Sequence, residues 1–561
     1  MAYRRFHSWM CDAIGLVSPR NWEDDWTMAA GEDEFDYLIV GAGSAGCVLA
    51  NRLSANPNIT VCLIEAGPPD RSPLIHVPLG MIRLGTHKTL RWHDQTTAQA
   101  EAGGRTILMP HGRTLGGSSA INGMVYMRGH PRDYDEWAAA GNPGWSYKDV
   151  LPYFRRSEHN EDFRDPEFHG QGGPLNVTSP KPLNGMVDVL FEAATSLQIP
   201  MRDDFNELEQ DGFGLRQITQ KDGYRVTTAT AFLDPVRSRK NLAILTGAHV
   251  GHVVLKNGIA AGVEIVVGSA RRMVRARREV ILSAGAIASP LVLMRSGIGP
   301  GTELQGHGIA VARDLSGVGG NLQDHVAAGV KWSSRSSVPY GISLRALPGI
   351  AWGVIEYALF RRGLFTSNIM QAGGFVRTDP AFDRPDIQYS FMPALRNARG
   401  GLTLGHGYFL NAFLLRPRSR GTVRLGGADI FAAPVIDPKF FSEPDDLVAL
   451  LRGVKLARRI LNTPAFEKYR NVELSPGASI QSDADLKDVI RKTAGTAYHP
   501  VGTCRMGQGV DAVVDAQLRV HGVGRLRVVD ASIMPTIIGG NTNAPTIMIG
   551  EKAADMILAS R

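Results

Sequence analysis

"FDYLIVGAGSAGCVLANRLSAN", residues 35–56, is the stretch that decides the class of fold. Its apolar beginning predicts a buried strand, and the spacing of apolar residues after the glycines predicts a helix. A second apolar stretch, "TVCLIEAG" at 60–67, contains the acidic Glu65 directly after its apolar run. A strand, a glycine turn, a helix, a second strand and an acidic residue in this order are typical of the βαβ unit that binds a dinucleotide.

Each element of this unit has a physical task. We expect Gly41 to allow the tight turn from strand to helix, Gly43 to leave room for a pyrophosphate, and Gly46 to let the helix pack on the strand. The N–H groups at the start of the helix would bind the phosphates, and Glu65 would accept hydrogen bonds from a ribose. The sequence shows no second glycine motif for a nicotinamide cofactor, which favours a flavin dinucleotide over NAD.

Composition and charge exclude several classes of protein. The chain has 561 residues, of which 43% are hydrophobic and 20% charged, so a large folded core is expected. The net charge of +7 comes from basic residues spread along the chain without a nucleic-acid-binding motif, so we expect no nucleic-acid partner. The basic run at 271–280 alternates arginines with apolar residues and predicts a strand with one solvated face.

The four cysteines predict neither disulfide bonds nor a cysteine-rich zinc site, because no two of them form a C-x-x-C pair. This usage is typical of a reducing compartment, and we expect a cytoplasmic protein, with membrane association as an alternative. Residues 1–34 are rich in aromatic side chains and are interpreted as an arm that packs on the body or on a partner, or as a peripheral membrane contact. Neither a secretory signal nor a membrane span is expected, and the apolar stretch 347–360 is interpreted as a buried or substrate-lining helix.

Four further stretches point in the same direction as the first. They are "HGRTLGGSSAINGMVYMRGHPRDYDEW" (111–137), "EVILSAGAIASPLVLMRSGIGP" (279–300), "GVGGNLQDH" (317–325) and "VVDASIMPTIIGGNTNAPTIMIGEKAADMI" (528–557). Together with residues 35–67, they resemble the glucose–methanol–choline (GMC) family of FAD oxidoreductases, and in particular its bacterial alcohol and choline dehydrogenases. The resemblance covers the chain from residue 35 to its end.

The resemblance implies an α/β architecture in which a Rossmann-like βαβ FAD-binding domain is interwoven with a substrate-binding domain built on an antiparallel sheet. We expect an arm at 1–34, FAD-binding segments at 35–160, 225–330 and 495–561, a mixed segment at 161–224, and the substrate-binding domain at 331–494. Composition alone shows no linker between separate domains, which agrees with interweaving.

The resemblance also implies which residues contact FAD. Some family members attach the cofactor covalently through a histidine, and Ile121 stands at that position here, so we expect non-covalent binding. The residues expected to contact the cofactor, from the glycine motif and the resemblance, are Gly41, Gly43, Ser44, Ala45, Gly46, Glu65, Ala66, Gly116, Gly117, Ser118, Asn122, Gly123, Met124, Val250, Asp530, Ala531 and Pro545.

His499, in "TAYHPVGTCRMG" at 496–507, admits three interpretations. As a zinc ligand with Cys504 it would lack the further ligands that zinc needs, and we predict no metal site. As an isolated histidine it could simply be packed in the core. As a base it matches the His-Pro motif of the family, and a neutral imidazole is suited to accept a hydroxyl proton.

The resemblance implies a second catalytic side chain at Asn543, whose amide would hold the substrate oxygen. Tyr498 and Gln371 are expected at the substrate. Choline-oxidising relatives carry a glutamate where Gln371 stands, so an uncharged primary alcohol is favoured over choline.

The sequence leaves several alternatives open. A choline-type dehydrogenase or an oxidase that uses O₂ are the nearest ones. A non-redox lyase or a photodecarboxylase with the same fold, and a flavoprotein without catalysis, are more remote. The electron acceptor (quinone, cytochrome, dye or O₂) and the state as monomer or homo-oligomer are not determined by the sequence.

Overall fold

The computed structural model describes residues 34–395 and 402–560. The arm predicted at 1–34 therefore falls, except for its last residue, outside the described part of the chain. The first elements are β1 (Glu34–Val40), α2 (Ser44–Leu53) and β2 (Val61–Ile64). β1 and β2 are parallel, with Leu38 opposite Cys62, so the βαβ unit predicted from the glycine motif is confirmed.

A seven-stranded sheet, the first sheet, is built around this unit, in the order β8-β2-β1-β11-β10-β9, with β23 also paired to β11. Its other strands are β8 (Leu242–Leu245), β9 (Ala248–Lys256), β10 (Ile259–Val267), β11 (Ala270–Leu282) and β23 (Leu526–Val528). β11 includes the basic run, and its arginines 271, 272, 275 and 277 are exposed while Val274 and Ala276 between them are buried. The predicted strand with a solvated basic face is confirmed.

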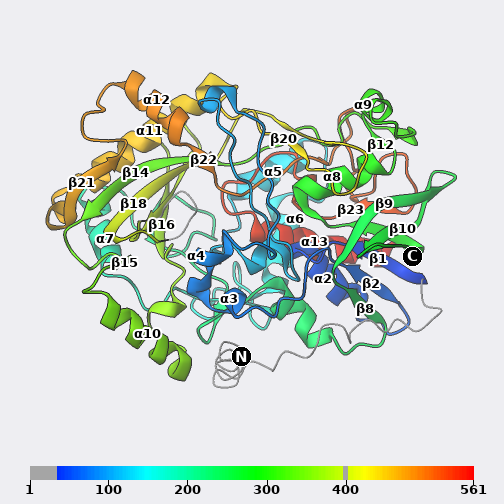
Figure 1. Ribbon diagram of the computed structural model, residues 1–561, viewed down its shortest axis with the longest axis horizontal. Coiled ribbons are helices and arrows are strands. Elements are labelled where there is room, and N and C mark those ends of the chain that lie inside the picture. Colours follow the sequence, from blue (N-terminus) through cyan, green and yellow to red (C-terminus); the bar gives the residue numbers. More distant parts are fainter. Residues whose placement is uncertain (1–33, 396–401, 561) are drawn as a thin grey trace.

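An eight-stranded sheet, the second sheet, is antiparallel, in the order β21-β14-β18-β17-β16-β5, and β15 and β22 pair with β18 and β14. Figure 1 shows the two sheets at opposite ends of the molecule. The strands are β5 (Gly212–Leu215), β14 (Val326–Ser334), β15 (Gly341–Ile342), β16 (Ala372–Val376), β17 (Ile387–Met392), β18 (Gly405–Leu414), β21 (Arg470–Ser475) and β22 (Gly495–Thr496).

The chain passes between the sheets several times, since β5 of the second sheet lies in sequence between β2 and β8 of the first, and β23 returns to the first. The interwoven α/β architecture expected from the resemblance is confirmed, whereas the boundaries of the individual segments remain a prediction.

Four two-stranded pairs complete the strands of the described chain: β3 (Glu158–Asn160) with β4 (Leu175–Val177), β6 (Gln220–Lys221) with β7 (Tyr224–Arg225), β12 (Ile298–Gly299) with β13 (Arg313–Asp314), and β19 (Thr422–Arg424) with β20 (Val435–Asp437).

Helices cover both sheets and bury one apolar core around each. α2 packs tightly on α13 because small residues meet there: a Cβ on Gly550 would lie 3.0 Å from Cα of Ala45. α11 packs on the second sheet. The helices besides α2 are α3 (Pro73–His76), α4 (Met81–Leu84), α5 (Pro131–Ala139), α6 (Tyr147–Ser157), α7 (Met186–Ser196), α8 (Gly285–Arg295), α9 (Gly301–Gly306), α10 (Leu347–Phe360), α11 (Pro444–Leu461), α12 (Asp483–Thr493) and α13 (Asn543–Ala559).

α10 corrects one expectation. The stretch 347–360 is a helix, but only Gly353 and Tyr357 in it are buried, so its interpretation as a buried helix is wrong, and its interpretation as a substrate-lining helix stays a prediction. The helix lies at the outer edge of the molecule, where Figure 1 shows it projecting from the body, and it touches the rest of the chain along one narrow seam. Among the described helices, none has the length and apolar character required to cross a membrane.

Candidate active site

The glycine turn after β1 is packed so closely that two of its glycines are required by the protein itself. Gly41 has φ +100°, and a Cβ there would lie 2.5 Å from the carbonyl oxygen of Ser283. A Cβ on Gly46 would lie 1.9 Å from the carbonyl oxygen of Gly41. These positions therefore serve the turn and the contact of helix with strand.

Gly43 differs, because the protein leaves the space beside it free. A Cβ on Gly43 would meet only the carbonyl oxygen of Ser283, at 3.9 Å. From the other side, the loop at 116–117 lies over the turn: Gly116 donates its N–H to the carbonyl of Ala42 at 2.8 Å, and a Cβ on Gly117 would lie 2.7 Å from Cα of Gly43. The turn and this loop form a cradle of backbone, which fits a bound pyrophosphate.

Glu65 holds the glycine turn from the end of β2. Its two carboxylate oxygens accept the N–H groups of Ala42 at 3.0 Å and Gly67 at 2.8 Å, and burial raises the pKa of its carboxyl to about 7. The carbonyl of Glu65 accepts the N–H of Ala248 at 2.9 Å, which brings the start of β9, where Val250 lies, to the same edge. The carbonyl of the neighbouring Ala66 accepts a hydrogen bond from Arg113.

A buried arginine holds the loop at 118–124. Arg225 Nη1 donates to the carbonyl of Asn122 at 2.7 Å and to its Oδ1 at 2.9 Å. The same Oδ1 accepts the N–H of Met124, which has φ +61°. The carbonyl of Gly123 accepts Asn368 Nδ2 at 2.9 Å, and Ser118 Oγ accepts the N–H of Gly112. The loop is thereby fixed from both domains.

The C-terminal segment ties these parts together. Asp530 Oδ2 accepts Gly285 N–H at 2.9 Å and the hydroxyl of Ser289 at 2.6 Å, and the carbonyl of Ala531 accepts Gly502 N–H at 3.3 Å. Pro545 lies buried in the first turn of α13. Within the described chain, the residues expected to contact the cofactor thus come from the β1–α2 turn, the edge at Glu65, the loop at 116–124 and the C-terminal segment.

His499 lies between two side chains that define its protonation. Asn541 Nδ2 donates to His499 Nε2 at 3.1 Å, and Gln388 Nε2 donates to Asn541 Oδ1 at 3.2 Å, which fixes the orientation of the asparagine amide. His499 Nδ1 lies 3.0 Å from Nδ1 of His325. Because His499 Nε2 accepts a hydrogen bond, its proton is on Nδ1 and is donated to His325. Nε2 therefore carries the lone pair that can act as a base when a substrate hydroxyl takes the place of the Asn541 N–H.

The backbone of His499 is held by a buried carboxyl. Asp324 Oδ1 accepts the N–H of His499 at 2.9 Å, and its Oδ2 accepts the hydroxyl of Thr496. Burial raises the pKa of Asp324 to about 7. Tyr498 has φ +66° and an exposed side chain. A residue other than glycine in this conformation is uncommon, and such strain is found where the surrounding structure imposes it.

Both imidazoles are neutral at neutral pH. Burial, together with His325 and Arg216, lowers the pKa of His499 well below its ordinary value. Burial and Arg416 lower the pKa of His325 to about 3. Arg216 is buried, donates to the hydroxyl of Ser390 at 3.0 Å and to the carbonyl of Tyr389 at 2.7 Å, and its Nε has no partner within the described residues.

Two residues expected near the substrate have side-chain amides that are bound to other parts of the protein. The amide beside His499 belongs to Asn541, whereas Asn543 is the first residue of α13 and its Oδ1 accepts the hydroxyl of Ser44 at 2.7 Å. Only Thr542 separates them, and the start of the helix turns Asn543 toward α2. Gln371 is fully buried, and its amide is bound to backbone: Oε1 accepts Asn184 N–H at 2.9 Å, and Nε2 donates to the carbonyl of Pro182 at 2.6 Å.

Sequence reasoning missed several residues around His499. His325 and Asp324 end the motif at 317–325, which precedes β14, but nothing in that motif indicates that it pairs with 495–501. Gln388 lies within β17 and Arg216 directly after β5, both in the second sheet, and neither belongs to a recognisable motif. Asn541 could have been found, because it stands in the same "GGNTNAPT" stretch as Asn543.

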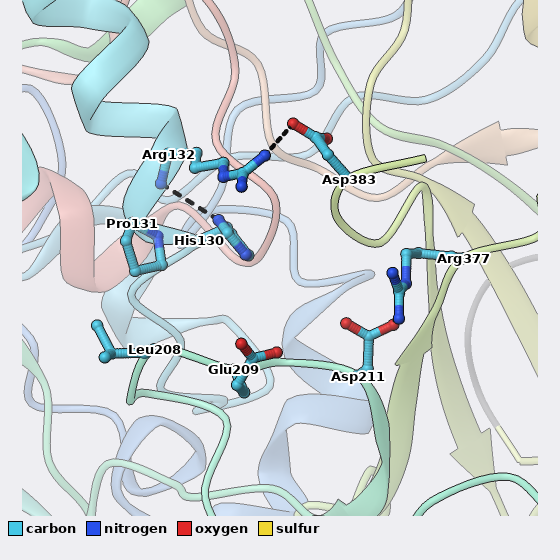
Figure 2. A pocket seen from close by; sticks show the side chains of 8 residues that line it. All are labelled: His130, Pro131, Arg132, Leu208, Glu209, Asp211, Arg377 and Asp383. Atoms are coloured by element: carbon cyan, nitrogen blue, oxygen red, sulfur yellow. Dashed lines mark hydrogen bonds and ion pairs between the residues drawn. The ribbon is translucent and has the colours of Figure 1, made fainter. Parts of the chain in front are cut away.

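A hollow on the surface, with a volume of about 390 Å³, is a poor candidate for the same chemistry. Figure 2 shows its charged lining, in which Arg132 pairs with Asp383 and Arg377 faces Asp211. It shares no residue with the surroundings of His499.

A dinucleotide cradle and a neutral imidazole base are both features that a flavin-dependent oxidoreductase requires. Comparison with known proteins agrees: residues 35–327 and 417–550 match the two models of GMC oxidoreductases. The chain belongs to the GMC oxidoreductase family, it is an enzyme, and FAD is its cofactor. The family expected from the sequence is confirmed.

Individual relatives cover nearly the whole chain. An alcohol dehydrogenase [acceptor] of Pseudomonas putida is 44% identical over 93% of this chain and 96% of its own length. An oxygen-dependent choline dehydrogenase of Brucella anthropi is 40% identical, over 94% and 96%. The crystal structure of pyridoxine 4-oxidase from Mesorbium loti superposes with a TM-score of 0.84 at 34% identity, over 93% of this chain and 98% of that one.

Proposed function

We propose that this enzyme oxidises an uncharged primary alcohol to the aldehyde, with His499 Nε2 as the base. The observation that carries the proposal is the hydrogen bond of 3.1 Å from Asn541 Nδ2 to His499 Nε2. It places an unprotonated nitrogen and an amide donor side by side, which are the two groups that a substrate hydroxyl requires. FAD, when bound, supplies the acceptor for the hydride of the same carbinol carbon.

The roles of the two side chains follow from their hydrogen-bonding capacity. A substrate hydroxyl would donate its proton to His499 Nε2, while its oxygen would accept from Asn541 Nδ2. The Nδ1–H of His499 would stay hydrogen-bonded to His325 throughout. The ring would therefore not rotate as Nε2 gains the substrate proton. We therefore transfer to Asn541 the orienting role that the sequence suggested for Asn543.

The charge near the base supports an uncharged substrate. Arg216, which contributes to the lowered pKa of His499, is a buried cation, and it would repel the quaternary ammonium of choline. The Pseudomonas putida relative is named for alcohol oxidation, in line with this reading. The alternative substrate is choline, and it is supported by the choline dehydrogenase relatives at 40% identity.

We further propose that FAD is bound without a covalent link. Ile121, at the position of the attaching histidine in some family members, has no nucleophilic atom. Acid precipitation is expected to release the flavin into the supernatant, and flavin retained in the pellet would contradict the proposal. A cytoplasmic location remains a separate prediction.

Anaerobic stopped-flow reduction over a panel of alcohols, with choline included, tests the function. Uncharged primary alcohols are expected to bleach the flavin with a higher kcat/KM than choline. His499→Ala should retain FAD but slow reduction by roughly 10²–10⁴-fold. A preference for choline would overturn the substrate assignment, and an unchanged rate in His499→Ala would overturn the role of the base. Admission of air then shows whether O₂ reoxidises the flavin.

A further inference from the structure

Helix α10 presents large apolar side chains to the outside of the protein. Trp352 is 59% exposed and Leu359 67% exposed, although an apolar helix is normally buried. Leu344, just before the helix, is also exposed. The exposed apolar side chains of the helix, which we call the α10 face, are Leu347, Trp352, Val354, Ile355, Leu359 and Phe360.

The opposite side of α10 is a narrow seam that fixes the helix on the body. Gly353 and Tyr357 are buried one turn apart, and the hydroxyl of Tyr357 donates to the carbonyl of Gly223 at 3.1 Å. The side chain of Glu356, the acidic residue of the helix, folds back onto Gly363. Its Oε2 fills the space of a side chain there, 2.0 Å from the position that a Cβ would take. The α10 face itself therefore carries no carboxylate.

Basic residues stand at both ends of the helix. Arg345 precedes it, and Arg361 and Arg362 follow it, with the side chains of Arg345 and Arg362 exposed. If a second copy of the chain packed face to face on α10, the basic ends of the two helices would meet whether the helices ran parallel or antiparallel. Repulsion between these like charges disfavours such a dimer. An anionic surface, in contrast, would attract both ends at once, in keeping with the net charge of +7.

We propose that α10 docks the protein on the surface of an anionic lipid bilayer. The helix of 14 residues is about 21 Å long, too short to cross a membrane, so it lies in the interface with the α10 face among the acyl chains and the arginines at the headgroups. Trp352, an amphipathic ring, suits that boundary. This docking does not depend on the proposed substrate.

A short segment links the docked helix to the loop at 118–124. α10 packs on the short helical turn η6 (Leu364–Thr366), and Asn368 directly after it donates to the carbonyl of Gly123 in the loop at 118–124. The docked helix and this loop are therefore connected through η6 and Asn368.

Cosedimentation of the FAD-loaded protein with vesicles tests the proposal. Wild type is expected to bind vesicles that contain phosphatidylglycerol at least about tenfold more strongly than vesicles of pure phosphatidylcholine. The triple variant Trp352→Ser, Leu359→Ser, Phe360→Ser should lose most binding to both. Arg345→Glu with Arg362→Glu should weaken binding to the anionic vesicles alone. Brominated lipids should quench tryptophan fluorescence in wild type more than in Trp352→Phe.

A matched triple variant serves as the control. Val472→Ser, Leu474→Ser and Val510→Ser remove comparably exposed apolar side chains far from α10 in sequence and should bind like wild type. Flavin content, and flavin reduction by alcohol without vesicles, report separately on folding and on the proposed function. Absence of binding to anionic vesicles overturns the proposal. So does a lipid-free dimer of wild type that the α10 variant converts to a monomer.

Discussion

His499 Nδ1 and His325 Nδ1 lie 3.0 Å apart, and they come from two segments that pair along β14 and β22. His325 is fully buried, and its low pKa keeps it neutral, so it can accept the Nδ1 proton of His499. Together with the amide of Asn541 at Nε2, this contact determines which nitrogen of His499 is basic. A structural histidine thereby fixes the tautomer of a catalytic candidate.

We predict that His325→Ala will lower kcat/KM for flavin reduction by about 10²-fold, because His499 loses the acceptor that holds its ring. His325→Gln should recover part of the rate, since the glutamine Oε1 can accept the same proton. Stopped-flow reduction at several pH values checks both variants. FAD content should stay at the wild-type level, and equal rates for the alanine and glutamine variants would contradict the role in fixing the tautomer.

The pH dependence of the wild-type enzyme follows from the direction of the shift on His499. Burial lowers its pKa, so the base stays unprotonated to pH values below the ordinary histidine range. Flavin reduction is therefore expected to hold its rate through pH 6.5 and to fall only at more acid pH. A fall of kcat/KM centred above pH 6.5 would contradict this expectation.

The neighbouring asparagines allow a sharp comparison. Asn541→Ala removes the amide at His499 Nε2 and should slow flavin reduction by about 10²-fold. Asn543→Ala removes a hydrogen bond to Ser44 and should change the rate only a few-fold. The two variants serve as controls for each other in the same stopped-flow assay. A larger loss of rate in Asn543→Ala would restore the assignment suggested by the sequence.

Two glycines of the turn, Gly43 and Gly46, should respond differently to an added side chain. Gly43→Ala leaves the protein free of clashes, so it should fold but bind FAD at least about tenfold more weakly. Gly46→Ala forces a Cβ against the carbonyl of Gly41 and should lower the yield of folded protein. Thermal unfolding of the apoprotein and flavin titration separate the two effects. Normal flavin affinity in Gly43→Ala would place the pyrophosphate elsewhere.

Asp324 should make the protein less stable as pH rises. Its folded pKa of about 7 lies above the unfolded value, so between about pH 4 and 7 the unfolded state releases the proton first and stability falls. Asp324→Asn can still accept the N–H of His499, but it does not titrate. The difference in Tm between wild type and this variant should therefore grow in favour of the variant from pH 5 to pH 8. A constant difference would show that Asp324 has an ordinary pKa.

The local parts of the fold could be predicted from the sequence, because the conformation of each depends on residues that are neighbours in the chain. Apolar spacing and the glycines at 41–46 predict a strand, a turn and a helix wherever they stand, and the alternating arginines of β11 predict an exposed strand face. The apolar stretch 347–360 was predicted correctly as a helix, but its exposure was not. Periodicity reports the local conformation, whereas burial depends on what the rest of the chain places beside the helix.

The sequence by itself determined the βαβ unit, the family and the histidine that is the candidate base. Each of these depends on a contiguous motif, and the residues of such a motif specify their own local conformation. Only the tertiary structure decided the partners of that histidine. The residues around His499 come from three different segments, and their side chains meet only when the two sheets are assembled. Asp324 and His325 contact His499 from one segment and Asn541 from a second, while Gln388, from a third, holds Asn541. Asn541 and Asn543 are alike in sequence, and the start of α13 is what turns one toward the base and the other toward α2.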